Sequence, residues 1–118
     1  MEKKYNYLDR LIAFAGNIIL LTKKIPKDIP GNVLSKQIIR SATSSALNFG
    51  ETQGTVTTKD YISKASICLK ELKETEVNLK ILKHINYGND TRQELQNECV
   101  ELIKICSTII KNKRQSLR

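Results

Sequence analysis

Side chains that could do chemistry are most concentrated between residues 41 and 54, where the sequence reads SATSSALNFGETQG. Ser44, Asn48 and Glu51 follow one another at spacings of four and three, so on a helix they share one face. A hydroxyl, an amide and a carboxylate on one face could position a substrate. Nucleophilic catalysis also needs a base within reach of the nucleophile, and this segment contains no histidine. The segment therefore predicts a packing and subunit-organising surface, and we do not expect the protein to be an enzyme.

The other candidates for chemistry are one histidine and three cysteines. His84 lies near the end of a predicted helix and is most simply a surface residue. Cys68, Cys99 and Cys106 have no C-x-x-C spacing, which argues against a zinc site or a disulfide framework. They fall on apolar helix stripes, where packing is their expected use. The sequence has no glycine-rich phosphate loop and no pair of Glu-x-x-His units, so we expect no metal and no cofactor.

Positive charge is the remaining functional signal. The chain has 20 Lys and Arg against 12 Asp and Glu, a net charge of +8. Such a surface attracts phosphate polymers, although solvated lysines are also normal on the polar faces of helical bundles. The candidates for contact with RNA or DNA lie at the end of the first predicted helix, on the third helix and in the tail: Lys23, Lys24, Lys27, Lys70, Lys73, Lys80, Lys83, Lys111, Lys113, Arg114 and Arg118.

Four long helices must position these residues. Apolar residues recur every three or four positions, and no segment alternates as a half-buried strand would. The helices are predicted over about residues 5–24, 31–53, 58–86 and 91–112, within one domain that spans 1–118. Heptad-like stripes joined by short connections predict an all-α, antiparallel up-down four-helix bundle.

Three local signals mark where helices begin. Pro30 follows the helix-breaking sequence IPKDI and is expected in the first turn of the second helix. Thr57 with Asp60, and Thr91 with Glu94, have the spacing of capping pairs. These pairs predict the starts of the third and fourth helices.

The first helix is apolar on two sides. A surface helix of a monomer needs only one apolar stripe. We therefore expect the second row, which includes Phe14 and Leu21, to meet another copy of the chain. The alternative is a central helix covered by its own chain. The first row comprises Leu8, Leu11, Ile12, Ala15, Ile18 and Ile19, and the second comprises Tyr7, Phe14, Leu21 and Ile25.

Charged residues in the second and third helices suggest an ion pair between them. Arg40 and Glu51 share a helix face but lie eleven residues apart, about 16 Å along the axis, so each is expected to find its partner elsewhere. Glu76 continues an apolar row on the third helix, where a carboxylate is costly unless it is paired. We expect Arg40, or a basic residue of another subunit, to meet Glu76 or Glu74. The alternative is that Glu76 is solvated at the edge of the stripe.

Two segments resemble a known family. The sequences QIIRSATSSALNFGETQG at 37–54 and KDYISKASICLKELKETE at 59–76 are similar to segments of the four-helix-bundle proteins encoded within intervening sequences of bacterial 23S ribosomal RNA genes. Thr52 stands where that family has a glycine, Ala46 where it often has a proline, and the chain has no Trp. The matching positions are Gln37, Ile38, Arg40, Ala42, Ser44, Asn48, Glu51, Gly54, Lys59, Tyr61, Glu74 and Glu76.

This resemblance implies an antiparallel bundle that assembles into a homo-oligomeric ring, with a pentamer as the expected size. A similar bundle is the accessory protein of diversity-generating retroelements, which works with a reverse transcriptase and its RNA. The predicted function is therefore a non-enzymatic adaptor that contacts RNA or DNA phosphates. The alternative is a protein–protein scaffold that binds no nucleic acid. The longest run of Ile and Leu is IILL at 18–21, so we expect a cytoplasmic protein with no membrane partner.

Overall fold

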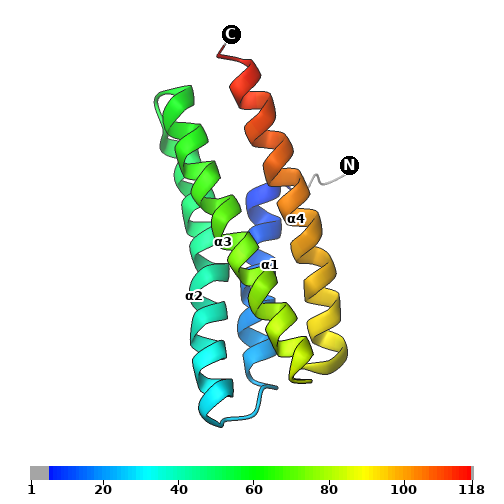
Figure 1. Ribbon diagram of the computed structural model, residues 1–118. Helices are drawn as coiled ribbons and strands as arrows, with labels where there is room; N and C mark the ends of the chain where they lie inside the picture. The colour runs from blue at the N-terminus through cyan, green and yellow to red at the C-terminus, as the bar shows by residue number, and fades with distance from the viewer. Residues whose placement is uncertain (1–5, 118) are drawn as a thin grey trace, which may run out of the picture.

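The protein folds as four helices that run alternately up and down and pack side by side (Figure 1). The computed structural model describes residues 6–117. Its elements are α1 (Tyr7–Thr22), α2 (Ile29–Glu51), the short 3₁₀ helix η1 (Thr52–Gly54), α3 (Thr58–His84) and α4 (Asn89–Gln115). The prediction of an all-α four-helix chain is confirmed, and each predicted helix overlaps an observed one over nearly its whole length.

Polar side chains fix the starts of the first three helices. The Asn6 side chain accepts a hydrogen bond from Asp9 N at 2.8 Å at the start of α1. The Asp28 side chain accepts one from Gly31 N at 2.8 Å, and Pro30 lies in the first turn of α2 as predicted. Thr57 Oγ1 accepts one from Asp60 N at 3.0 Å, which confirms the predicted cap of α3.

Gly31 is required by a close approach of the chain to itself. A Cβ atom at this position would lie 1.8 Å from the carbonyl oxygen of Pro26. The connection from α1 to α2 is therefore folded tightly against the first turn of α2, and only glycine leaves room for it.

The predicted start of α4 at Thr91 is wrong. The helix begins at Asn89, after a turn in which Gly88 has φ +93° and Asn86 has φ +63°. The buried Arg92 guanidinium stabilises this turn because Nη1 donates to Tyr87 O at 2.9 Å and to Leu82 O at 3.4 Å. A cation at carbonyls near the end of α3 also complements the negative end of its helix dipole. Tertiary packing of Arg92, rather than a local hydroxyl cap, therefore decides where α4 starts.

The core lies along the bundle axis. The apolar stripes of α3 and α4 face this core, and Ile110 is the buried isoleucine in the last turns of α4. Phe14 and Leu21 are also buried within their own chain. The expectation that their row meets another copy is therefore wrong, because α2 and α4 flank α1 and their side chains enclose it.

The outward face of α1 is nevertheless apolar. Ile12, Ile19 and Leu20 remain exposed, and they belong mainly to the row that was expected to form the core contact. The sequence thus identified correctly that α1 is apolar on two sides, but the buried side takes residues from both predicted rows: Leu11, Ala15 and Ile18 of the first row are buried beside Phe14 and Leu21 of the second. Among residues 6–117, no helix has an apolar stretch long enough to span a bilayer.

Candidate functional site

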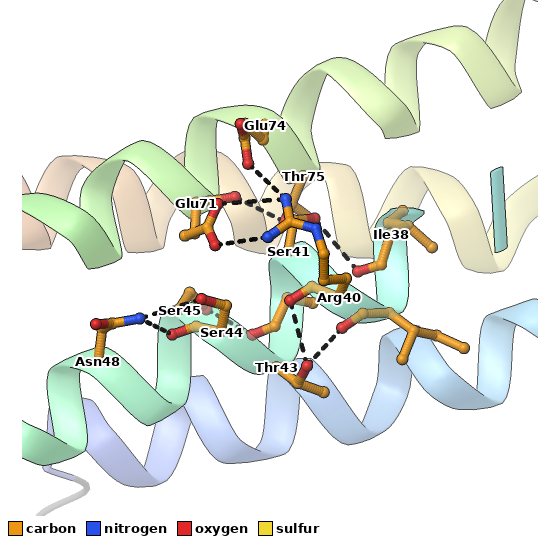
Figure 2. Close-up of polar contacts among 12 residues, drawn as sticks. Ile38, Arg40, Ser41, Thr43, Ser44, Ser45, Asn48, Glu71, Glu74 and Thr75 are labelled. Atoms are coloured by element: carbon orange, nitrogen blue, oxygen red, sulfur yellow. Dashed lines mark hydrogen bonds and ion pairs between the residues drawn. The ribbon is translucent and has the colours of Figure 1, made fainter. Parts of the chain in front are cut away.

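The contact between α2 and α3, called the α2–α3 seam below, contains a buried pair of hydroxyl groups. Ser41 Oγ and Thr75 Oγ1 lie 2.7 Å apart, and both side chains are fully buried. Each hydroxyl also bonds a carbonyl of its own helix: Ser41 to Ile38 O at 3.3 Å and Thr75 to Glu71 O at 2.9 Å. Figure 2 shows that the two side chains meet between the helices. Small hydroxyl residues therefore allow close packing while every buried oxygen keeps a partner.

An ion cluster lies beside this pair. Arg40 Nη1 is 3.0 Å from Glu71 Oε2, and Nη2 is 2.9 Å from Glu74 Oε2 (Figure 2). The pair between Arg40 and Glu74 was predicted and is confirmed. Glu71 was not predicted, although its side chain is only 9% exposed and it is the more buried partner. Its spacing of four residues before Thr75 was a signal, because it places Glu71 on the side of α3 that faces α2.

The cluster favours the ionised form of Glu71. Burial by itself raises the pKa of this carboxyl. Hydrogen bonds with Glu74, Ser44 and Arg40, together with the charge of Arg40, outweigh burial and lower the pKa below its ordinary value of 4.5. Hydrogen bonds to Glu71 and Glu74 raise the pKa of Arg40. The cluster is therefore a charged structural contact at neutral pH.

The face formed by Ser44, Asn48 and Glu51 contains no reactive arrangement. Asn48 Nδ2 donates to Ser44 O at 2.9 Å and to Ser44 Oγ at 3.1 Å. Glu51 Oε1 lies 2.7 Å from Lys64 Nζ, so Glu51 links α2 to α3 near the end of the bundle. The expectation that Arg40 and Glu51 find separate partners is confirmed.

Glu76 does not join the cluster around Arg40. Its nearest cation is Lys80 on the same helix, with 3.9 Å between Oε2 and Nζ, and its side chain is 24% exposed. Of the two expected acidic partners, Glu74 thus pairs with Arg40, and Glu76 lies at the edge of the stripe.

The thiols are buried in the core. Cys99 Sγ donates to Leu72 O at 3.3 Å, and Cys106 Sγ donates to Ala65 O at 3.4 Å. Burial raises the pKa of Cys99 to about 12, so this thiol stays protonated at neutral pH. Within residues 6–117, no three His, Cys, Asp or Glu side chains gather as a metal site would require.

The candidate nucleic-acid contacts fall into three separate groups. Lys23, Lys24 and Lys27 are exposed near the connection between α1 and α2. The exposed cations of the last turns of α4 lie at the opposite end of the bundle (Figure 1). One of them, Lys113, has its Nζ 4.4 Å from the centre of the Tyr61 ring. Arg118 lies outside the described residues. The fold therefore does not bring all the candidates together: Lys111, Lys113 and Arg114 are at one end, and Lys23, Lys24, Lys27 and Lys83 are at the other.

The α3 lysines form the third group, and it runs along the bundle. Lys70, Lys73, Lys80 and Lys83 are all exposed. Lys80 lies near Glu76, whereas the other three form no ion pair with another residue of the described chain. The acidic residues nearest in sequence, Glu71 and Glu74, are engaged by Arg40.

Comparison with known proteins identifies the family. The family model of the 23S rRNA-intervening sequence protein matches residues 3–108. The chain belongs to this family. A crystal structure from Bacteroides thetaiotaomicron, described as a protein with unknown function from the S23 ribosomal protein family, is 33% identical and superposes with a TM-score of 0.81. The match covers 90% of this chain and 99% of that one. None of the curated proteins matches this chain.

Membership in the 23S rRNA-intervening sequence protein family agrees with the observed fold. The two segments that carry the resemblance, 37–54 and 59–76, include the residues that join α2 to α3. Arg40, Glu51 and Glu74 all form contacts between helices. These residues therefore have a structural explanation that does not require a ligand.

Proposed function

We propose that this member of the 23S rRNA-intervening sequence protein family is a non-enzymatic, homo-oligomeric adaptor that contacts RNA or DNA phosphates. The observation that carries the proposal is the charge along α3. Lys70, Lys73 and Lys83 are exposed and have no acidic partner among residues 6–117. Unneutralised lysines along one helix attract a phosphate backbone without selecting a base sequence.

Two features support an adaptor over an enzyme. The hydroxyl, amide and carboxylate groups of the α2–α3 seam bond one another or nearby charges, so they are not free to activate a substrate. The described thiols are buried, and they lie against backbone carbonyls or apolar neighbours. The predicted oligomer, with a pentameric ring as the expected form, agrees with the apolar groups that remain exposed on α1 and α3.

A protein–protein scaffold that binds no nucleic acid is the second candidate function. It is favoured by the apolar residues Val77 and Ile81, which lie exposed among the same lysines of α3. An apolar surface rimmed by charges is typical of protein interfaces, whereas phosphate contacts do not need it.

Binding to labelled RNA and DNA across a salt gradient tests the proposal, with the native mass of the protein measured in parallel. The triple variant Lys70→Gln, Lys73→Gln and Lys83→Gln should bind more weakly and with a shallower salt dependence. Each lost phosphate contact should reduce the slope of log K against log salt by about 0.9 for duplex DNA and about 0.7 for single strands.

The matched control removes the same charge elsewhere, with Lys36→Gln, Lys59→Gln and Lys104→Gln. The proposal expects this control to bind more tightly than the α3 variant. Equal losses would indicate non-specific attraction to net charge. Absence of any binding by the wild-type protein at low salt would reject the nucleic-acid function and favour the scaffold.

A further inference from the structure

The outward side of α1 is an apolar helix face with nothing from its own chain over it. Residues 11–22 of α1 carry no charged side chain. Ile12 is 55% exposed and Leu20 is 54% exposed, and Gly16 and Ile19 lie between them at helical spacing. These four residues are called the α1 outer face below.

Gly16 has no explanation within the chain. A Cβ atom at this position would meet nothing within 4 Å. Glycine in a helix interior costs about 1 kcal/mol relative to alanine, so the intramolecular packing alone would favour a larger residue. Between Ile12 and Leu20, the missing side chain leaves a shallow space into which a side chain of another molecule fits.

The outward side of α3 is hollowed. An open groove of about 920 Å³ runs along it and reaches α2. Its lining includes Leu69, Lys70, Lys73, Val77 and Ile81 of α3 and Gln37 and Arg40 of α2. Val77 is 56% exposed and Ile81 is 42% exposed. This α3 groove combines apolar side chains with two lysines that have no ion-pair partner among the described residues.

The α1 outer face and the α3 groove lie on opposite sides of the bundle. Helices α1 and α3 each pack against α2 and α4 but not against each other, so they lie on a diagonal of the bundle (Figure 1). A two-fold dimer through either surface would cover that surface and leave the other in water. A head-to-tail contact, in which one surface meets the other on the next copy, covers both.

We infer that the α1 outer face of one copy docks into the α3 groove of the next, and this inference rests on the proposed homo-oligomer. The lengths agree, because Ile12 to Leu20 spans about 12 Å and Leu69 to Ile81 about 18 Å at the helical rise. Asp9 lies one turn before Ile12 on the same side of α1 and forms no ion pair with another described residue.

The charges select the direction in which the two helices run. Asp9 precedes Leu20 by eleven residues, and Lys70 precedes Ile81 by the same number. When α1 of one copy runs parallel to α3 of the next, Leu20 meets Ile81 while Asp9 lies near Lys70 and Lys73. One carboxylate balances only one of these two positive charges, so a positive charge remains there, together with Lys83, for the phosphate contacts of the proposed function. Gly16 then lies opposite Val77, which fills the space left by the missing side chain.

Single charged substitutions at the two surfaces provide the test. Leu20→Glu disables the α1 outer face, and Ile81→Glu disables the α3 groove. Each variant alone should self-associate at least tenfold more weakly than the wild type in sedimentation or native mass measurements. An equimolar mixture should form a 1:1 dimer that grows no further, because each copy retains the surface that the other lacks. Leu47→Glu, at an exposed position of α2, is the matched control and should assemble as the wild type does.

The outcomes separate this inference from the proposal on which it rests. A wild-type protein that stays monomeric at high concentration overturns both. A wild-type oligomer that persists in Leu20→Glu or Ile81→Glu, or a mixture that stays monomeric, overturns the head-to-tail contact alone. Circular dichroism checks that each variant is folded. If either is not, the exposed positions Ile12 and Val77, changed to Asp, repeat the mixing experiment with the same expected result.

Discussion

The α2–α3 seam and the α1–α4 seam join neighbouring helices in the same bundle by different means. At the α2–α3 seam, the buried hydroxyls of Ser41 and Thr75 and the ion cluster around Arg40 connect the two helices. The second, between α1 and α4, has one ion pair, Arg10 to Glu98 at 2.7 Å, and a hydrogen bond from the Tyr7 hydroxyl to a carbonyl of α4. Each seam borders an open groove, of about 920 Å³ beside Arg40 at the first and of about 620 Å³ beside Phe14 at the second. Ser41 and Thr75 do not line the first groove.

The difference shows what small polar residues do in a helical bundle. A buried serine lets two helices approach closely, but its hydroxyl then needs a partner on one of them. Such a seam tolerates little change in side-chain volume or polarity. At the α1–α4 seam, the groove leaves room for larger side chains beside the core residues Phe14 and Leu95, and the ion pair is partly solvated. Four predictions test this comparison.

A larger side chain at each seam should give the largest difference in stability between the two seams. Ser41→Leu places a large side chain where the serine is fully buried, and we expect a loss of about 2–3 kcal/mol in the free energy of unfolding. Ala13→Leu makes a similar increase in the α1–α4 groove and should change stability by less than about 0.5 kcal/mol. Urea unfolding of both variants measures the contrast. Equal losses would show that the two seams are equally packed.

Removal of the hydroxyl pair should reduce the free energy of unfolding by less than the volume increase at Ser41 does. Thr75→Val keeps the approximate shape but removes the hydroxyl, with an expected loss of about 1–2 kcal/mol. The double variant with Ser41→Ala should lose less than the sum of the two single variants, because the two hydroxyls bond each other at 2.7 Å. A double-mutant cycle with simple additivity would contradict a direct contact.

Acid should weaken the ion cluster. We expect the resulting loss in the free energy of unfolding to be smaller than the loss from removing the hydroxyl pair. Folding lowers the pKa of Glu71 from its ordinary value of 4.5, so the folded state favours the carboxylate. The resulting stabilisation is complete above about pH 4.5 and is lost as the pH falls through the lower pKa of the folded state. Urea midpoints between pH 7 and pH 3 should therefore fall more steeply for the wild type than for Glu71→Gln. Glu101→Gln, at an exposed site, is the charge-matched control. If the urea midpoints of Glu71→Gln and the wild type fall equally steeply with pH, Glu71 is not responsible for the loss of stability in acid.

The smallest effect is expected at the ion pair of the α1–α4 seam. Arg10 and Glu98 have side chains 31% and 34% exposed, so solvent screens their attraction. Arg10→Ala should therefore reduce the free energy of unfolding by at most about 1 kcal/mol, and less at high salt. A loss larger than that of Thr75→Val would show that this seam depends on its ion pair more than the geometry indicates.

Local sequence signals predicted most of the fold. The Thr57 cap of α3 and the place of Pro30 in the first turn of α2 depend on residues adjacent in the chain. The three-and-four spacing of α3 and α4 identifies their buried sides. The start of α4 was predicted wrongly because it depends on Arg92, whose partners are carbonyls of another segment. The candidate site was predicted in part: Arg40 and Glu74 were expected partners and do pair, whereas the cost of an unpaired carboxylate was argued for Glu76, which lies outside the cluster, and Glu71 was missed.

The sequence by itself determined that this protein is a four-helix chain, that α1 is apolar on two sides, and that Arg40 needs acidic partners. These properties follow from periodicity and from the cost of burying charge, and both can be read along one chain. Only the tertiary structure decided that Phe14 and Leu21 face inward while Ile12 and Leu20 face outward. Two apolar stripes on one helix are equivalent until neighbouring helices cover part of each, so which of their residues are buried is a property of packing.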